Sequence, residues 1–239
     1  MRPLAMNTGV SNQATQHLDV DFVSREPSGS KLWTLLAPVM LIVTSLLVFV
    51  AARNAASDRI AQLTGFAYYW TVGGVIIPLI LLQREGYVAL LARSRLPWNA
   101  RLVAAVIALF APAVFGFLFA FPYLFPVETA WLLPGLALYA LLNGTFEEVF
   151  WRGLFITRFR NSPWLGFVYP GVLFGAWQLV LWAIFDFWFR PSWLLVLVVA
   201  AGTGLLYGWV AWRTRSIRWT VLAHVLTNLS GVGALVLFA

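Results

Sequence analysis

The chain contains no cysteine and very little charge. Asp, Glu, Lys and Arg together make up 10% of its 239 residues, whereas apolar residues make up 61%. The lack of cysteine excludes disulfide frameworks, thiol nucleophiles and metal sites built from thiolates. Soluble domains are typically about 25% charged and about 45–50% apolar, so this composition argues against a soluble globular enzyme. Such high hydrophobicity also excludes a disordered chain.

The uncharged stretches have the length of membrane-spanning helices. Seven runs contain no Asp, Glu, Lys or Arg, and they cover residues 32–52, 60–83, 102–127, 129–146, 161–185, 191–212 and 219–239. A helix of about 20 apolar residues crosses a bilayer core of about 30 Å. In lipid the backbone must form its hydrogen bonds within the segment, which favours helices. We therefore predict an all-α fold, a polytopic membrane helix bundle of about seven transmembrane helices over residues 32–239. A polar cytoplasmic tail is expected over residues 1–31.

Most basic residues fall on alternate connections between these runs. If the chain crosses the membrane at each run, thirteen of the sixteen basic residues share the side of the N-terminal tail, and only Arg53, Arg59 and Arg190 lie opposite. Basic residues concentrate on the cytoplasmic side, so we predict a plasma (inner) membrane protein with a cytoplasmic N-terminus and an outside C-terminus. The basic residues form no helix face interleaved with aromatic residues, which argues against nucleic acid as a partner. The lipid bilayer is the expected environment.

Small residues recur at a spacing that suits helix packing in membranes. Gly171 and Gly175 are four residues apart within one run, and Gly204 and Gly208 are four apart within the next. Such pairs allow two helix backbones to approach closely. We therefore expect these glycines to lie at helix–helix contacts.

Two adjacent glutamates interrupt the apolar pattern in the segment Asn143-Gly-Thr-Phe-Glu147-Glu148-Val-Phe-Trp-Arg152. On a helix, Glu148 and Arg152 share a face because they are four residues apart, which predicts an ion pair. Glu147 is rotated by about 100° and has no such partner on its own helix. A free, desolvated carboxylate is a suitable general base for activating water. The alternative is that both glutamates lie at a helix end in the headgroup layer, where they have only a structural role.

Two further runs carry isolated polar residues. In the run 219–239, His224 and Asn228 are one helical turn apart on the same face, at depths of about 9 Å and about 15 Å from Arg218. A histidine in an apolar helix is as often a satisfied core residue as a catalyst, and the glutamate pair favours the catalytic interpretation. Gln178, in the run 161–185, is by itself best interpreted as a residue that hydrogen-bonds between helices.

Three short motifs therefore follow one another between about residues 140 and 230. They are Glu147-Glu148-Val-Phe-Trp-Arg152, Phe174-Gly-Ala-Trp-Gln178 and His224-Val-Leu-Thr-Asn228. In this order, each on a separate predicted span, they resemble the motifs of the CPBP family of intramembrane proteases. That family includes the CAAX prenyl endopeptidases and bacteriocin-processing proteins of the Abi group.

The resemblance implies an intramembrane endopeptidase that hydrolyses a peptide bond of a membrane protein or peptide. In the family, the first glutamate activates water, histidines assist it, and an asparagine helps to stabilise the oxyanion. On this chain the resemblance implies that Glu147, His224 and Asn228 have these roles. Glu148 belongs to the same catalytic group, and Arg152 and Gln178 have supporting positions.

The chain departs from the family pattern at one residue. The second motif of the family normally ends in histidine, and this chain has Gln178 there. A glutamine can donate and accept hydrogen bonds but cannot take up a proton at neutral pH. Two interpretations therefore stay open: an active endopeptidase, or a catalytically inactive relative that binds membrane proteins as a scaffold. A transporter is a third alternative, although no internal repeat typical of transporters is present.

The family is sometimes described as metalloproteases, which raises the possibility of zinc. The sequence contains no His-Glu-xx-His motif. Catalytic zinc sites usually have three protein ligands in which histidine is prominent. We therefore predict no metal site, and the sequence implies no other cofactor.

Overall fold

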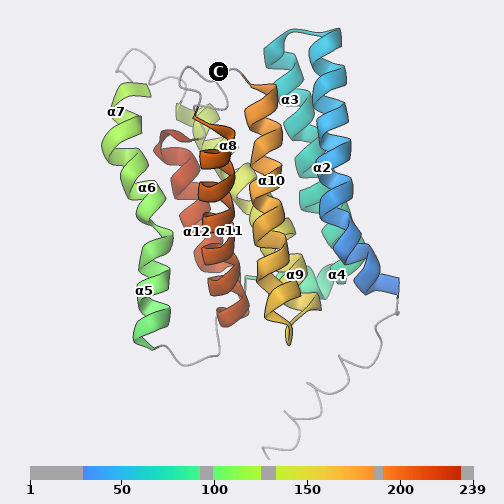
Figure 1. Cartoon of the computed structure of the whole chain (residues 1–239), viewed down its shortest axis with the longest axis vertical. Coiled ribbons are helices and arrows are strands. Elements are labelled where there is room, and N and C mark those ends of the chain that lie inside the picture. The colour runs from blue at the N-terminus through green and yellow to red at the C-terminus, as the bar shows by residue number, and fades with distance from the viewer. Residues whose placement is uncertain (1–28, 92–98, 125–132, 186–190, 233–239) are drawn as a thin grey trace, which may run out of the picture.

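The protein is a bundle of helices. The computed structural model describes residues 29–91, 99–124, 133–185 and 191–232. Within these ranges the chain forms seven helical rods and no β-strand, which confirms the predicted all-α membrane bundle. The rods run alternately up and down, side by side (Figure 1). Almost all of the predicted polar tail and the last residues of the chain lie outside the described ranges.

Five rods contain a segment that is long and apolar enough to cross a membrane. These segments are Lys31–Ala55, Asp58–Leu82, Ala100–Ala120, Trp164–Ile184 and Trp193–Thr214. The first rod is α2 (Gly29–Ala55), and the second joins α3 (Asp58–Tyr69), η1 (Trp70–Ile76) and α4 (Ile77–Ala89). The third joins α5 (Ala100–Leu109), α6 (Ala111–Phe115), η2 (Gly116–Ala120) and α7 (Phe121–Leu124). The other two are η5 (Trp164–Val168) with α10 (Tyr169–Ile184), and α11 (Trp193–Thr214). The η elements are short π-helical stretches within these rods.

The remaining two rods carry the polar motifs. One joins α8 (Leu133–Glu148), η4 (Val149–Gly153) and α9 (Leu154–Arg158), and the other joins α12 (Arg218–Thr227) and η6 (Asn228–Val232). The first is as long as a membrane span, but Glu147, Glu148 and Arg152 lower its mean hydropathy. The second is described over a shorter stretch than a full span. The seven predicted runs thus correspond to seven rods. The two rods that are too short or too polar to be candidate membrane spans carry the glutamates and His224.

The bundle is apolar outside and partly polar inside. Large side chains such as Leu47, Ile80 and Ile107 point outward from different rods and are exposed. Glu147, Glu148 and Arg152 are buried instead. A soluble protein rarely exposes so much apolar surface, whereas a surface in contact with lipid is expected to be apolar. This distribution agrees with a bundle that is surrounded by lipid.

Glycines let neighbouring rods pack backbone to backbone. A Cβ atom on Gly171 would lie 3.0 Å from the Gly204 backbone, and one on Gly175 would lie 2.9 Å from the Ala201 side chain. These contacts join α10 to α11, so the predicted helix contacts are confirmed. A Cβ atom on Gly144 would lie 2.8 Å from the backbone nitrogen of Val225. The glycine on α8 therefore allows α12 to approach the rod that carries the glutamates.

The rods alternate in the way that the orientation argument requires. In Figure 1 the start of α2 lies at the lower end of the bundle. The end of α4 and the start of α5 lie at the same end, as do the connections from α9 to η5 and from α11 to α12. In the sequence, most of the basic residues fall between these helix ends or at them. The side of the membrane that this end faces stays a prediction.

Candidate active site

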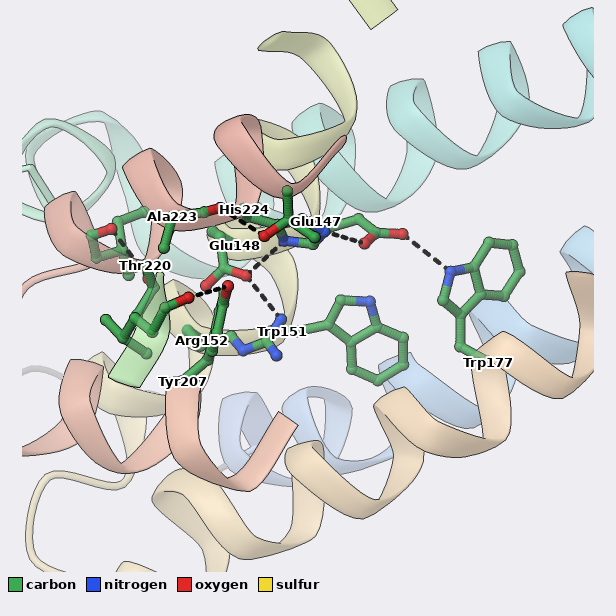
Figure 2. A network of polar contacts seen from close by, with 12 residues as sticks. Glu147, Glu148, Trp151, Arg152, Trp177, Tyr207, Thr220, Ala223 and His224 are labelled. Carbon is green, nitrogen blue, oxygen red and sulfur yellow. Dashed lines mark hydrogen bonds and ion pairs between the residues drawn. The ribbon is translucent and has the colours of Figure 1, made fainter. Parts of the chain in front are cut away.

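The candidate site lies where the rod of α8 meets α12, in the interior of the bundle (Figure 2). Glu147 and Glu148 are 2% and 0% exposed, Arg152 is 1% exposed, and His224 on α12 is 9% exposed. The rod continues from Glu148 through η4 to Arg158. At about 1.5 Å per residue, Glu147 lies roughly 16 Å from that end and roughly 21 Å from the Leu133 end. The glutamates therefore lie within the rod and away from its ends, whereas the alternative interpretation places them at a helix end.

Glu148 has two cationic or proton-donating partners. Arg152 Nη1 lies 2.9 Å from Glu148 Oε1, four residues further along the same rod, so the predicted ion pair is present. His224 Nδ1 lies 2.8 Å from the same oxygen. The Arg152 guanidinium also packs over the ring of Phe174, at 4.4 Å from its centroid, and near the ring of Tyr207. Arg152 therefore neutralises Glu148 and is itself enclosed by aromatic rings.

Glu147 has partners from two other rods. Its Oε2 lies 3.3 Å from His224 Nε2, and its Oε1 accepts a hydrogen bond from Trp177 Nε1 at 3.0 Å. Both partners of Glu147 lie on other helices, so spacing along its own helix could not indicate them. His224 lies between the two glutamates, with one ring nitrogen directed at each (Figure 2).

This arrangement constrains the protons of the site. A carboxylate that is paired with a guanidinium can only accept hydrogen bonds, so His224 donates its Nδ1 proton to Glu148. The contact between Nε2 and Glu147 Oε2, at 3.3 Å, is an ion pair only when His224 carries one further proton. When that proton is on His224, the site holds two carboxylates, one guanidinium and one imidazolium. The four groups then have no net charge, which reduces the cost of burying them.

Asn228 and Gln178 are placed differently. Asn228 begins η6, one turn after His224, and is buried. Its side-chain Nδ2 has no hydrogen-bond partner among the described residues, so it is a free donor one helical turn from the histidine. Gln178 on α10 is half-buried, and within the described ranges it forms no hydrogen bond with this cluster. The preceding residue, Trp177, makes the contact with Glu147 instead.

Three aromatic residues of the site were missed by the sequence argument. The rings of Trp177 and Tyr69 stack with centroids 4.0 Å apart, and Trp151 Nε1 donates to the Tyr69 hydroxyl at 2.7 Å. Trp151 and Trp177 lie inside the first and second motifs, which is the signal that could have identified them. Tyr69 lies on α3, far from either motif, and the sequence contains no comparable signal for it.

The residues present do not fit a zinc ion. Both ring nitrogens of His224 face carboxylates, at 2.8 Å and 3.3 Å, so neither is directed at a vacant ligand position. Glu148 is already paired with Arg152. Over the described part of the chain, no group of three or more His, Cys, Asp or Glu side chains has an arrangement that could hold a metal ion. Zinc usually requires several free imidazole or carboxylate ligands, and this site offers no free imidazole nitrogen.

Comparison with known proteins identifies the segment that contains this site. Residues 129–230 match the family model described as "Rce1-like: Type II CAAX prenyl endopeptidase Rce1-like". No curated protein and no solved structure matches the chain. The matched segment contains the two glutamates, Arg152, His224 and Asn228, and it includes the region that resembles the CPBP family. Residues 129–230 are thus an Rce1-like segment, and the resemblance to the CPBP family of intramembrane proteases is confirmed.

Proposed function

We propose that this protein is an intramembrane endopeptidase that hydrolyses a peptide bond of a membrane protein or peptide, using water activated by Glu147. The observation that carries the proposal is the contact between Glu147 and His224, buried inside a membrane-type bundle. Charged and polar groups at such depth are costly, and in membrane proteins they usually serve a function. The match of residues 129–230 to a family model of type II CAAX prenyl endopeptidases supports hydrolysis as that function.

In this proposal the shared proton starts on His224, so that Glu147 is an ionised base. As a water molecule attacks the carbonyl carbon, one of its protons moves to Glu147 and its oxygen forms the new bond to carbon. The resulting oxyanion is stabilised by the free Nδ2 donor of Asn228 and by the nearby imidazolium of His224. The carbon–nitrogen bond then breaks, and the proton held by Glu147 passes to the leaving amine.

Glu148 and Arg152 have an orienting role in this scheme. The Glu148 carboxylate accepts from His224 Nδ1 and so holds the ring with Nε2 towards Glu147. Arg152 balances the charge of Glu148 and keeps it from competing for the shared proton. This is the usual division between a reacting group and the hydrogen-bonded group that orients it.

We further infer that the N-terminus is cytoplasmic, that the C-terminus lies outside, and that the substrate reaches the site from the cytoplasmic side. The ends of α9 and α11, which carry Arg158 and Arg213, lie at the end of the bundle where the basic residues gather. Positively charged connections favour the cytoplasmic face, which here is that of the plasma (inner) membrane.

The second candidate function is that of an inactive relative that binds membrane proteins. The observation that favours it is Gln178, which occupies the position of the histidine in the second motif. Without that histidine, the chain has one fewer group able to exchange a proton. The two candidates predict opposite results in a cleavage assay.

The test is cleavage of a peptide library by the purified protein in detergent or liposomes. We expect the wild type to cleave and Glu147→Ala to lose activity by a factor of about 10²–10⁴, the usual contribution of a general base. Asp58→Asn is the matched control, because Asp58 is an exposed carboxylate paired with Arg53 and is expected to retain full activity. Cleavage that survives Glu147→Ala would overturn the proposal. A silent wild type that gains activity on Gln178→His would favour the inactive relative.

A further inference from the structure

The carboxylate of Glu147 is held on the side away from His224 by an indole. Trp177 Nε1 donates to Glu147 Oε1 at 3.0 Å, and Glu147 Oε2 faces His224. A carboxylate has only two oxygens in one plane, so a donor fixed at one oxygen sets the direction of the other. Trp177 therefore controls which way the proposed base points.

Trp177 is itself fixed by a second aromatic residue. The Tyr69 ring lies parallel to the Trp177 ring, with an interplanar angle of 10° and a centroid distance of 4.0 Å. Phe49 also contacts the Trp177 ring, with centroids 6.4 Å apart. Trp177 and Tyr69 are both buried. The indole has no room to turn away, since side chains in a packed interior cannot rotate without displacing their neighbours.

Trp151 completes this aromatic group. Its Nε1 donates to the Tyr69 hydroxyl at 2.7 Å, so the hydroxyl accepts from the indole. The hydroxyl proton of Tyr69 therefore stays available for another acceptor. Trp151 is four residues after Glu147 on the same rod, whereas Tyr69 and Trp177 come from α3 and α10. Three separate rods therefore contribute to the group that holds the Trp177 indole against Glu147.

The chemistry of these donors differs from that of a histidine. An indole N–H is only a donor, so it can hold an ionised carboxylate but cannot accept or deliver a proton. Trp177 comes directly before Gln178, the residue that stands where the family has its second histidine. Gln178 lacks a hydrogen bond with Glu147 within the described ranges, and Trp177 has one.

From these contacts we propose that Trp177, supported by Tyr69 and Trp151, is the positioning residue for Glu147 and replaces the second-motif histidine in that role. The inference rests on the proposed hydrolase function. It means that the site works with one histidine, His224, and that the substitution at Gln178 does not by itself make the protein inactive.

The first test separates binding from turnover. Trp177→Phe keeps a ring against Tyr69 and removes the N–H donor, so we expect kcat to fall about 10–100-fold, as for the loss of a hydrogen bond to a charged group. KM is expected to stay close to that of the wild type, because the indole orients the base and does not hold substrate. Trp182→Phe is the matched control on the same helix: it loses an indole bond to the Pro191 carbonyl and is expected to leave both constants unchanged. Equal kcat for Trp177→Phe and wild type would overturn the proposal, as would a large gain in kcat on Gln178→His.

The second test does not depend on activity. In protein labelled with ¹⁵N-tryptophan, the signal of the Trp177 indole is identified by its loss in Trp177→Phe. We expect Glu147→Ala to shift this signal strongly, because the hydrogen bond to the carboxylate is lost, and Asp58→Asn to leave it in place. If the wild type cleaves no peptide but the signal shifts, the proposed hydrolysis fails while the indole contact stands. A signal that does not move on Glu147→Ala overturns the positioning role whatever the activity.

Discussion

Removal of the Arg152 charge is the sharpest test of how this bundle tolerates buried ions. We consider Arg152→Met, which keeps a long side chain against the Phe174 ring and removes the guanidinium. Glu148 would then lose a partner that lies 2.9 Å away, in a place where neither side chain reaches water. Only His224, at 2.8 Å from the same carboxylate oxygen, would remain to balance it.

The size of the effect follows from this geometry. With an effective dielectric constant of about 20, two unit charges at this separation attract each other by about 6 kcal/mol. The free-energy cost of removing both ions from water offsets part of that attraction. Breaking a buried pair therefore usually costs about 3–5 kcal/mol of stability. We expect Arg152→Met to lie near the lower figure, because His224 Nδ1 still donates to the same carboxylate oxygen at 2.8 Å. The double variant Arg152→Met/Glu148→Gln removes both charges, so its cost should be much smaller than the sum of the single costs.

The measurement is a double-mutant cycle on the free energy of unfolding, obtained by equilibrium unfolding in mixed micelles. We expect a coupling energy of at least about 3 kcal/mol between Arg152 and Glu148. The Arg53–Asp58 pair is the control: its side chains are 38% and 71% exposed, so its coupling should be about 0.2–1 kcal/mol after screening by solvent. A buried pair that couples by less than about 0.5 kcal/mol, the usual limit of additivity, would refute the argument.

Two further predictions concern packing and orientation. Gly144→Ala places a methyl group 2.8 Å from the backbone nitrogen of Val225, so it should destabilise the protein by about 1–3 kcal/mol and reduce cleavage. Gly135→Ala on the same helix meets nothing within 4 Å, so thermal unfolding should show it to be as stable as the wild type or more stable by up to about 1 kcal/mol. Equal effects of the two substitutions would contradict the close approach of α8 and α12. A C-terminal fusion to a reporter that works only outside the cytoplasm should be active, and a reporter that is active only in the cytoplasm would refute the predicted orientation.

The architecture could be predicted from the sequence because few backbone structures can cross a lipid bilayer. An uncharged run of about 20 residues must form a helix to satisfy its backbone in a bilayer, so the seven runs could be counted directly. The Glu148–Arg152 pair was equally accessible, since two residues four apart on a helix share a face whatever surrounds them. The glycine contacts between α10 and α11 could also be predicted from local spacing, because small residues four apart mark the helix face that packs.

Contacts between rods could not be predicted in this way. Trp177 reaches Glu147 across 30 residues of chain, and Trp151 reaches Tyr69 across 82. Neighbouring residues on a helix point about 100° apart, so nothing in the local pattern shows whether Trp177 or Gln178 faces the glutamates. The relative rotation of α8 and α10 decides this, and that rotation depends on packing throughout the bundle. The family motif directed attention to Gln178, one residue away from the side chain that makes the contact.

The position of the ion pair within a single helix has a consequence for biosynthesis. Because 76 residues separate Glu148 from His224, the helix that carries the glutamates is synthesised and can enter the membrane before α12 exists. At that stage Arg152 is the local counterion of Glu148, so the charge of this glutamate is already neutralised when the helix enters the bilayer. Glu147 then still lacks the histidine that would share its proton. The ion pair of Glu148 thus needs residues of one helix alone, whereas the proposed hydrolysis also needs His224, which is synthesised later.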